Sequence, residues 1–341
     1  MRQLSLLYTA NQQCYGVQYA PNNNSILACI SCDKFGISGS ASMYIIQHSE
    51  NSVLESKFQI IDSFRFGATL FDIDWSSIDH HLILTGNGDG SIAIWKWPPV
   101  NNINPYDRKP IYVSKEHKKE VYSVQWEPSG MRSYHLLSAS WDKTIKIWNL
   151  NNTGLTCLVS LDAHDGMVYS GAWNPKMTGL LLSGSADKTF RFWDVNKINT
   201  RSPPIFVSKP NSSDILCADW SAFDQNIFTL GYASGLIEIR DYRNMKEPVH
   251  SIQMAHDYAI KKIKFSPHIP DLFASVSYDM TTKIWNLKGQ LIDESKNHSE
   301  FAYGIDFDPL IPNRLVDCGW DRKVVISEFQ VPGLSSRNVL I

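Results

Sequence analysis

A histidine, a serine and an aspartate recur at fixed positions along this 341-residue chain, and a tryptophan follows each set. Such a set could act as a catalytic triad, in which the imidazole takes a proton from the serine hydroxyl. An active site would occur once, however, whereas this set recurs in several copies. We therefore interpret it as a buried hydrogen-bond relay from the indole N–H through serine and histidine to aspartate, which holds a tight turn. Its members are His117, His164 and His256, Asp89, Asp142, Asp187, Asp279 and Asp321, and Trp95, Trp148, Trp193 and Trp285.

Other motifs for catalysis or metal binding are absent from the sequence. It contains no G-x-x-x-x-G-K-[ST], no G-x-S-x-G and no H-E-x-x-H. The glycine-rich stretch 86–90 falls at one of the repeated aspartates, which favours a turn over a phosphate-binding loop. Cys29 and Cys32 form one C-x-x-C pair, but a zinc site needs further ligands and no second pair exists. We therefore expect no enzyme activity, no cofactor and no metal.

These residues belong to a longer pattern that repeats along the chain. Its clearest copies are HLLSASWDKTIKIWN (135–149), LLLSGSADKTFRFWD (180–194) and LFASVSYDMTTKIWN (272–286). The aspartate position recurs every 42 to 53 residues, and the tryptophan position falls six residues after it in every copy. A period of about 40–45 residues with Trp-Asp-like ends is typical of the four-stranded blades of a propeller.

A second alternating run precedes each copy and indicates a half-buried inner strand. Seven such runs occur, at 13–19, 69–75, 120–126, 167–173, 214–220, 259–265 and 301–307. The sequence therefore predicts an all-β chain folded as a seven-bladed WD-repeat β-propeller.

A ring of blades has to pair its first and last strands, because an unpaired edge invites aggregation. The alternating segment 2–9 belongs to no blade, so we expect it to supply the outer strand of the seventh blade. Residues 1–329 then form a single propeller, and residues 330–341 form a C-terminal tail. Loops and irregular outer strands are expected in the longer polar linkers, which cover 47–58, 97–112 and 196–213.

Composition and charge restrict the possible function. Hydrophobic residues make up 43% of the chain and charged residues 19%, as in a globular protein. The 32 basic and 34 acidic residues nearly balance, whereas a nucleic-acid surface needs a basic stripe. The first apolar stretch is too short for a signal-peptide core, and no apolar run approaches the roughly 18 residues of a membrane span. We expect no nucleic-acid partner and no direct membrane insertion.

One face of a propeller presents residues around the central channel. They flank the first buried residue of each inner strand or precede the repeated aspartate. Nine of these twenty positions are aromatic, against 12% of the whole chain, and only Glu120, Asp214 and Lys261 are charged. Aromatic side chains often anchor binding interfaces, although the same rings could pack sideways on neighbouring blades. Such a face suits an amphipathic peptide whose basic side chain meets Glu120 or Asp214.

Several segments resemble the peroxisomal import receptors for the type 2 targeting signal, the peroxin-7 family of WD-repeat proteins. The motif SWDKTIKIW (140–148) is shared with many WD-repeat proteins and is less specific than the others. The likeness runs from about residue 13 to 329, and the polar insertion near 97–112 departs from it. The more specific segments are GATLFDIDW (67–75), EHKKEVYSVQW (116–126), YAIKKIKFSPH (258–268), HSEFAYGIDF (298–307) and VDCGWD (316–321).

The resemblance implies a cytosolic receptor that cycles to the peroxisomal membrane and matrix. It would bind an N-terminal nonapeptide, R/K-L/V/I-x5-H/Q-L/A, on cargo such as a peroxisomal thiolase, with help from a co-receptor and peroxisomal docking proteins. Glu120 and Asp214 would hold the basic residue of this signal. Its apolar side would contact Tyr122, Trp141, Tyr169, Tyr278, Phe301, Tyr303 and Trp320.

The alternative is a WD-repeat scaffold or adaptor subunit of another complex, of the ubiquitin-ligase or chromatin type. Such an adaptor would often add an F-box-like helical segment or a basic face, and the sequence contains neither.

Overall fold

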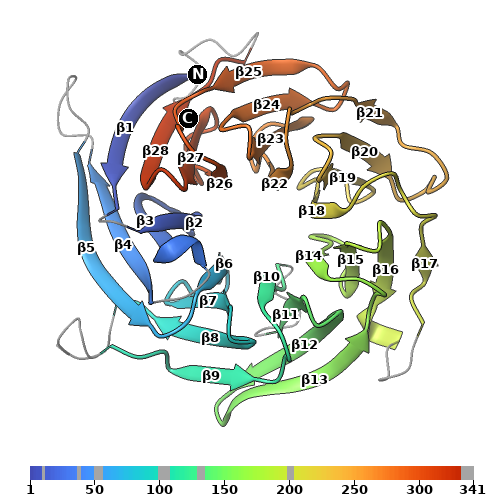
Figure 1. The fold of residues 1–341 in the computed structure, drawn as a ribbon, viewed down its shortest axis with the longest axis horizontal. Coiled ribbons are helices and arrows are strands. Elements are labelled where there is room, and N and C mark those ends of the chain that lie inside the picture. The colour runs from blue at the N-terminus through green and yellow to red at the C-terminus, as the bar shows by residue number, and fades with distance from the viewer. Residues whose placement is uncertain are drawn as a thin grey trace.

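The computed structural model describes residues 1–9, 12–36, 40–49, 57–98, 108–128, 135–197 and 203–331. They form seven four-stranded antiparallel sheets, arranged as blades around a central channel (Figure 1). The predicted fold class, an all-β seven-bladed propeller, is confirmed. Among the described residues, no helix is long and apolar enough to cross a membrane.

Six blades use four consecutive strands each, numbered from the channel outward. Blade 1 contains β2 (Gln13–Ala20), β3 (Asn23–Cys32), β4 (Ala41–Ser49) and β5 (Lys57–Phe66). Blade 2 contains β6 (Leu70–Trp75), β7 (Leu82–Asn87), β8 (Ser91–Lys96) and β9 (Tyr112–Lys115). Blade 3 contains β10 (Val121–Trp126), β11 (His135–Ser140), β12 (Thr144–Asn151) and β13 (Gly154–Asp162).

The second half of the ring follows the same order. Blade 4 contains β14 (Val168–Trp173), β15 (Leu180–Ser185), β16 (Phe190–Asp194) and β17 (Phe206–Val207). Blade 5 contains β18 (Ile215–Trp220), β19 (Ile227–Tyr232), β20 (Ile237–Asp241) and β21 (His250–Ile252). Blade 6 contains β22 (Ile260–Phe265), β23 (Leu272–Ser277), β24 (Thr282–Asn286) and β25 (Leu291–Ser295). Blade 7 contains β26 (Ala302–Phe307), β27 (Arg314–Gly319), β28 (Lys323–Glu328) and β1 (Arg2–Tyr8).

Blade 7 joins the two ends of the described chain. Strand β1 pairs antiparallel with β28, with Leu6 opposite Val325 and Tyr8 opposite Lys323. The first strand in the sequence is therefore the outermost strand of the last blade, and the ring has no open junction between blades 7 and 1.

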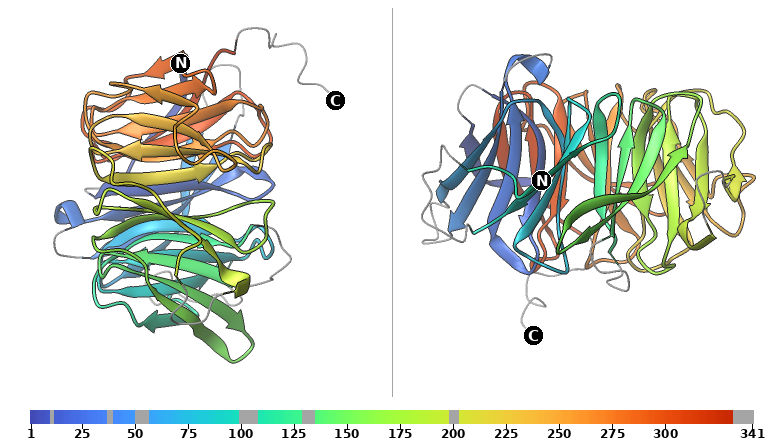
Figure 2. Two further views of the ribbon diagram at one scale, coloured as in Figure 1. Left: turned by 90° about the vertical axis from the view of Figure 1, so that its right-hand side faces the viewer. Right: turned by 90° about the horizontal axis from the view of Figure 1, so that it is seen from below.

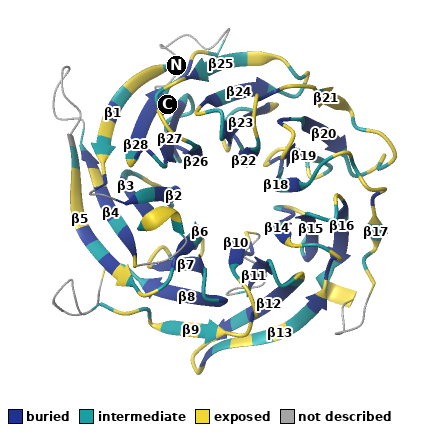
Figure 3. Cartoon of the chain, viewed as in Figure 1, coloured by how far each residue is buried: buried dark blue, intermediate teal, exposed yellow. Residues whose placement is uncertain are grey.

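Neighbouring blades bury their apolar faces against each other, so the core is a ring of layers between blades. Between blades 2 and 3, for example, Leu84 and Ile94 pack with Val124, Leu136 and Trp148. Second strands such as β7 are buried throughout, whereas outer strands such as β9 alternate between half-buried and exposed residues (Figure 3). Strands buried on both faces require apolar side chains in both directions. The turns that join these strands gather on the two flat faces of the ring (Figure 2).

Hydrogen bonds join the repeated residues in blades 3, 4 and 6. In blade 3 the indole of Trp148 donates to Ser138 at 2.8 Å, and Ser138 lies 2.7 Å from His117. His117 in turn lies 3.0 Å from Asp142, which also accepts the backbone N–H of Thr144. These side chains are occupied in holding the turn. Equivalent contacts join Trp193, Ser183, His164 and Asp187 in blade 4, and Trp285, Ser275, His256 and Asp279 in blade 6.

Blade 2 uses a shorter version of this relay. Trp95 donates to Thr85 at 3.0 Å, and Asp89 accepts the hydroxyl of Ser91 at 2.6 Å. The turn holds its aspartate without a histidine.

Blade 7 replaces the serine of the relay by an acid. His298 lies 3.1 Å from Asp317 and 2.9 Å from Asp321. Burial alone would lower the pKa of His298, but these two carboxylates raise it to about 10. In blades 4 and 6 burial prevails and lowers the pKa of His164 and of His256. Blade 7 therefore contains a charged imidazole where the other two contain a neutral one.

The predicted linkers differ in length from the loops that the structure describes. Strand β4 extends to Ser49 and β5 begins at Lys57, so both ends of the 47–58 linker are strand. The third linker, 196–213, contains β17, an outer strand of only two residues. Residues 50–56, 99–107, 198–202 and most of the predicted tail, from 332 on, lie outside the described residues.

Candidate functional site

Each of the seven inner strands carries a β-bulge near its first residue. The pairing of the inner strand with the second strand skips one residue at this point in every blade. A bulge redirects the side chain that it contains, and all seven skipped residues line the central channel. We call them the bulge ring: Tyr15, Phe71, Tyr122, Tyr169, Leu216, Lys261 and Tyr303.

Further aromatic rings lie on the turns beside the bulge ring. Trp141, Tyr278 and Trp320 directly follow second strands, and Phe301 directly precedes β26. Tyr278 and Phe301 stack with ring centres 4.5 Å apart, and Trp141 lies 5.3 Å from Tyr122. The rings of both sets form one surface, which we call the aromatic mouth: Tyr15, Phe71, Tyr122, Trp141, Tyr169, Tyr278, Phe301, Tyr303 and Trp320.

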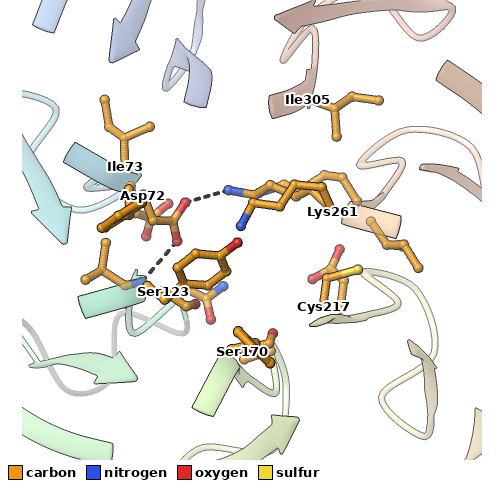
Figure 4. A pocket seen from close by; sticks show the side chains of 18 of the residues that line it. Asp72, Ile73, Ser123, Ser170, Cys217, Lys261 and Ile305 are labelled. Carbon is orange, nitrogen blue, oxygen red and sulfur yellow. Dashed lines mark hydrogen bonds and ion pairs between the residues drawn. The ribbon is translucent and has the colours of Figure 1, made fainter. Parts of the chain in front are cut away.

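Two rings and one lysine meet across the channel. The hydroxyl oxygens of Tyr122 and Tyr303 are 3.2 Å apart, although one residue belongs to blade 3 and the other to blade 7. The ammonium of Lys261 lies 3.6 Å from the ring centre of Tyr122 and 4.6 Å from that of Tyr303, within the range of cation–π attraction. Figure 4 shows Lys261 reaching into the channel. Together these groups form the floor of the mouth.

Burial sets the charges of this floor. It lowers the pKa of Lys261 to about 8 and raises the pKa of Tyr122 to about 12. Burial also raises the pKa of Tyr303. The two phenols therefore stay neutral near pH 7, and Lys261 keeps a positive charge at the centre of the mouth.

Polar side chains of the inner strands line the same channel as the bulge ring. The acidic groups there are occupied. Asp72 binds the ammonium of Lys262 at 2.7 Å (Figure 4), and Asp74 accepts a backbone N–H of the neighbouring blade at 2.7 Å. Asp219 and Asp306 bind backbone N–H groups of neighbouring blades in the same way. These contacts tie blade to blade and leave the carboxylates poorly placed to bind a ligand.

Glu120 and Asp214 occupy the rim of the mouth and differ from the channel acids. Each directly precedes an inner strand, in blades 3 and 5, and each uses its backbone carbonyl to accept an N–H of its own blade at 3.0 Å. Both residues are partly exposed. In the part of the chain that the structure describes, neither carboxylate has a hydrogen-bond or ion-pair partner. Burial and the nearby charge of Asp214 raise the pKa of Tyr169, which places this carboxylate beside the rings.

The structure gathers the sequence-predicted rings at one opening but gives them two different roles. Tyr122 and Tyr303 expose 8% and 3% of their surface, so these two lie in the floor and offer a ligand less contact area than the sequence suggested. The remaining five keep partial exposure beside the opening: Trp141, Tyr169, Tyr278, Phe301 and Trp320.

Phe35 is an aromatic residue of this face that sequence reasoning missed. It lies in the 3₁₀ turn η1 (Lys34–Gly36), it is 52% exposed, and its ring centre lies 5.4 Å from that of Trp320. The only signal in the sequence is that blade 1 has the segment ISCDKFGISGS where other blades have the S-x-D turn. Such a departure predicts an irregular turn without showing where its side chains lie.

The described ranges contain no group of three or more His, Cys, Asp or Glu side chains that could hold a metal ion. Five of the six cysteines are buried and Cys157 is half-buried, all as free thiols.

Comparison with known folds agrees with this architecture. Residues 108–149, 155–194 and 246–286 match the model of the family "WD domain, G-beta repeat". The WD40 β-propeller domain of Doa1 matches 95% of both chains with a TM-score of 0.73 and 19% sequence identity, which supports the fold alone.

Comparison with curated proteins gives a more specific result. The peroxisomal targeting signal 2 receptor of Mus musculus is 32% identical and covers 94% of this chain and 96% of its own length. Peroxisome biogenesis protein 7 of Arabidopsis thaliana is 30% identical, and this match covers 92% of this chain and 94% of the Arabidopsis protein. Both matches cover more than nine tenths of the chain. The chain therefore belongs to the family of peroxisomal targeting signal 2 receptors.

Proposed function

We propose that this protein binds the N-terminal type 2 peroxisomal targeting signal of cargo proteins across the aromatic mouth. The observation that carries this proposal is the pair of rim carboxylates, Glu120 and Asp214, which have no partner among the described residues. Two free anions beside partly exposed rings suit a peptide with one basic and several apolar side chains. The chain's relatives named as receptors of this signal support the same conclusion.

The signal R/K-L/V/I-x5-H/Q-L/A fits such a surface when it is helical. In a helix, its positions 1, 2, 8 and 9 fall within about a third of the circumference. The basic residue and the apolar residues therefore lie on one side. Nine residues of helix span about 13 Å, which is short enough to lie across the opening of the ring.

A co-receptor completes this proposal. A nine-residue helix is barely stable in water, and an interface below about 1,200 Å² is usually weak. A second protein that covers the bound signal adds buried area and offsets the ordering cost. The receptor then delivers cargo, such as a peroxisomal thiolase, from the cytosol to docking proteins at the peroxisome and returns.

Binding without catalysis is consistent with the relay. The histidines, serines and aspartates that could have formed a triad are engaged in turns that repeat from blade to blade, so they do not gather in one cleft. We propose no chemical step and no cofactor for this protein.

Peptide binding tests the proposal directly. Fluorescence anisotropy with a labelled R-L-x5-H-L nonapeptide is expected to give saturable binding, and replacing its arginine by alanine is expected to weaken binding about tenfold or more, because a charge-assisted contact is lost. A scrambled nonapeptide of the same composition serves as the control. Equal binding of all three peptides would contradict the receptor role and favour the adaptor alternative.

A further inference from the structure

The turn that carries Phe35 has an unusual backbone. Lys34, Phe35 and Gly36 have φ angles of 49°, 56° and 70°. Side chains larger than glycine rarely adopt this left-handed conformation, and two in succession store strain that the surrounding structure must hold. Strain of this kind also occurs at binding sites, where the surrounding structure holds a side chain in place for its ligand.

Contacts from two blades hold this turn in place. Gln13 accepts the backbone N–H of Phe35 at 3.2 Å, and the carbonyl of Gly36 accepts the hydroxyl of Thr69 at 2.8 Å. Gln13 belongs to blade 1, whereas Thr69 directly precedes the inner strand of blade 2. The turn is therefore fastened to the face of the ring, from which it projects (Figure 2).

The fold itself makes little use of the ring that this turn presents. Phe35 contacts Trp320 but leaves 52% of its surface exposed. Trp320 also contacts other rings of the mouth: its ring centre lies 5.1 Å from that of Phe301 and 5.8 Å from that of Tyr303. Phe35 thus extends the aromatic mouth outward and adds a raised wall at the junction of blades 7 and 1.

This wall lies opposite the two rim carboxylates. Glu120 and Asp214 belong to blades 3 and 5, so blade 4 lies between them. In a ring of seven blades, the point across the channel from blade 4 is the junction of blades 7 and 1 (Figure 1). A helix that crosses the mouth from the carboxylates therefore points toward Phe35 and Trp320.

The floor supports the same orientation. The ammonium of Lys261 lies at the centre of the mouth, over Tyr122 and Tyr303. A basic side chain is repelled from the centre and attracted to the carboxylates on one side. On the opposite side, the rings of Phe35 and Trp320 lie beside two exposed residues of opposite charge, Lys34 and Glu300, whose charges offset each other.

Resting on the proposed function, we propose that Phe35 and Trp320 bind the apolar residue at position 9 of the signal, while Glu120 and Asp214 hold the basic residue at position 1. Phe35 is then a specificity-determining residue, and the mouth accepts the signal helix in one direction only.

A double-mutant cycle tests this assignment. Phe35→Ala is expected to weaken binding of the R-L-x5-H-L peptide about 5- to 20-fold, since a partly exposed aromatic anchor is lost. For the peptide with alanine at position 9, the affinities of the parent protein and F35A should differ by less than twofold. Replacing position 2 of the peptide by alanine should reduce its affinity by the same factor for both proteins. Phe35→Trp is expected to restore most of the affinity.

Met254→Ala provides a matched control. Met254 also has a positive φ, of 53°, and is 79% exposed, but it lies two residues after the outer strand β21. M254A should bind as the parent does, and both variants should keep the parent's melting temperature within about 2 °C.

Three outcomes separate the inference from the function on which it rests. If the parent shows arginine-dependent binding and F35A binds equally well, the role of Phe35 is wrong and the receptor function stands. If F35A weakens both peptides by the same factor, the assignment to position 9 is wrong. If the parent does not distinguish arginine from alanine at position 1, the receptor function itself fails.

Discussion

Acidic residues around the channel fall into two groups, and the difference lies in their partners. Asp72 is paired with a lysine, and Asp74, Asp219 and Asp306 accept backbone N–H groups at 2.7 to 3.0 Å. A carboxylate so occupied would have to give up a contact before it could bind a ligand. The rim carboxylates have no such contact to lose among the described residues, so their charge is available to a basic side chain.

Removing the rim charges should weaken binding without affecting the fold. Glu120→Gln and Asp214→Asn are each expected to reduce affinity for the signal peptide about tenfold or more, because a charge-assisted contact is worth about 1.5–3 kcal/mol. The melting temperature should stay unchanged, since neither carboxylate supports the fold. Peptide titration and thermal unfolding of both variants check this.

Glu247→Gln is the control for these variants, because Glu247 is exposed and lies between β20 and the outer strand β21. The site assignment is wrong if E120Q and D214N bind the peptide as E247Q does.

At the scale of the element, the backbone of the turn and bulge repeats from blade to blade, whereas the side chains that it presents differ. The bulge in each inner strand points one residue into the channel, so the ring can change its chemistry without changing its backbone. Seven blades supply five aromatic residues, one leucine and one lysine at this position. The relay behind the turn varies too, and the acid-rich version in blade 7 has a consequence for pH.

Stability should depend on pH through His298. The carboxylates of Asp317 and Asp321 raise its pKa to about 10, above the ordinary value of 6.5. A group with a raised pKa in the folded state stabilises the fold fully below its ordinary pKa, and this contribution is lost as the pH rises through the folded value. His298→Asn is therefore expected to lower the melting temperature by several degrees at pH 6.5, and the difference from the parent should disappear near pH 10.

Thermal unfolding of H298N and the parent between pH 6.5 and pH 10 measures this effect. His256→Asn is the comparison, because burial lowers the pKa of His256 and the folded state holds its imidazole neutral. A constant difference between H298N and the parent over this range would contradict a charged His298.

The repeated elements could be predicted from the sequence because their signal is local. The six-residue offset between the aspartate and tryptophan positions lies within one hairpin and is present in six copies. The positions that line the channel follow from the same register. What a local pattern could not show is which of these side chains meet across the ring: Tyr122 and Tyr303 are 181 residues apart, yet their hydroxyls touch.

Residues that depart from the repeat were predicted least well. Phe35 lies in a turn with two successive left-handed residues, a conformation that residue type alone does not predict. Likewise, Glu120 forms no ion pair among the described residues, although Lys118 and Lys119 directly precede it in the sequence. Neither point follows from periodicity.

At the scale of the whole molecule, one strand closes the ring. Strand β1 supplies the outer edge of blade 7, and its Ser5 also meets His48 of blade 1 at 3.0 Å. The mouth is shared by six of the seven blades, so its geometry depends on the closed ring.

Removing residues 1–9 should therefore affect the entire protein. The truncated chain leaves the outer edge of β28 unpaired, and we expect its melting temperature to fall by about 10 °C or more and its affinity for the signal peptide to fall with it. Adding a synthetic peptide of residues 1–9 should recover part of the loss. Calorimetry and peptide titration measure both effects.

Tyr8→Ala is the control for this deletion, since its side chain is 59% exposed and the strand remains in place. A truncated protein that melts at the same temperature as Y8A would show that the closure contributes little.

The pairing of β1 with β28 also fixes the order of events during synthesis. Strand β1 leaves the ribosome before β28, which is made more than 300 residues later. Until then the nascent chain has an unsatisfied strand edge at each end, which is the state most exposed to aggregation. A gene with a premature stop codon in blade 7 should accordingly yield a product that chaperones retain and proteases remove, in place of a receptor with one blade missing.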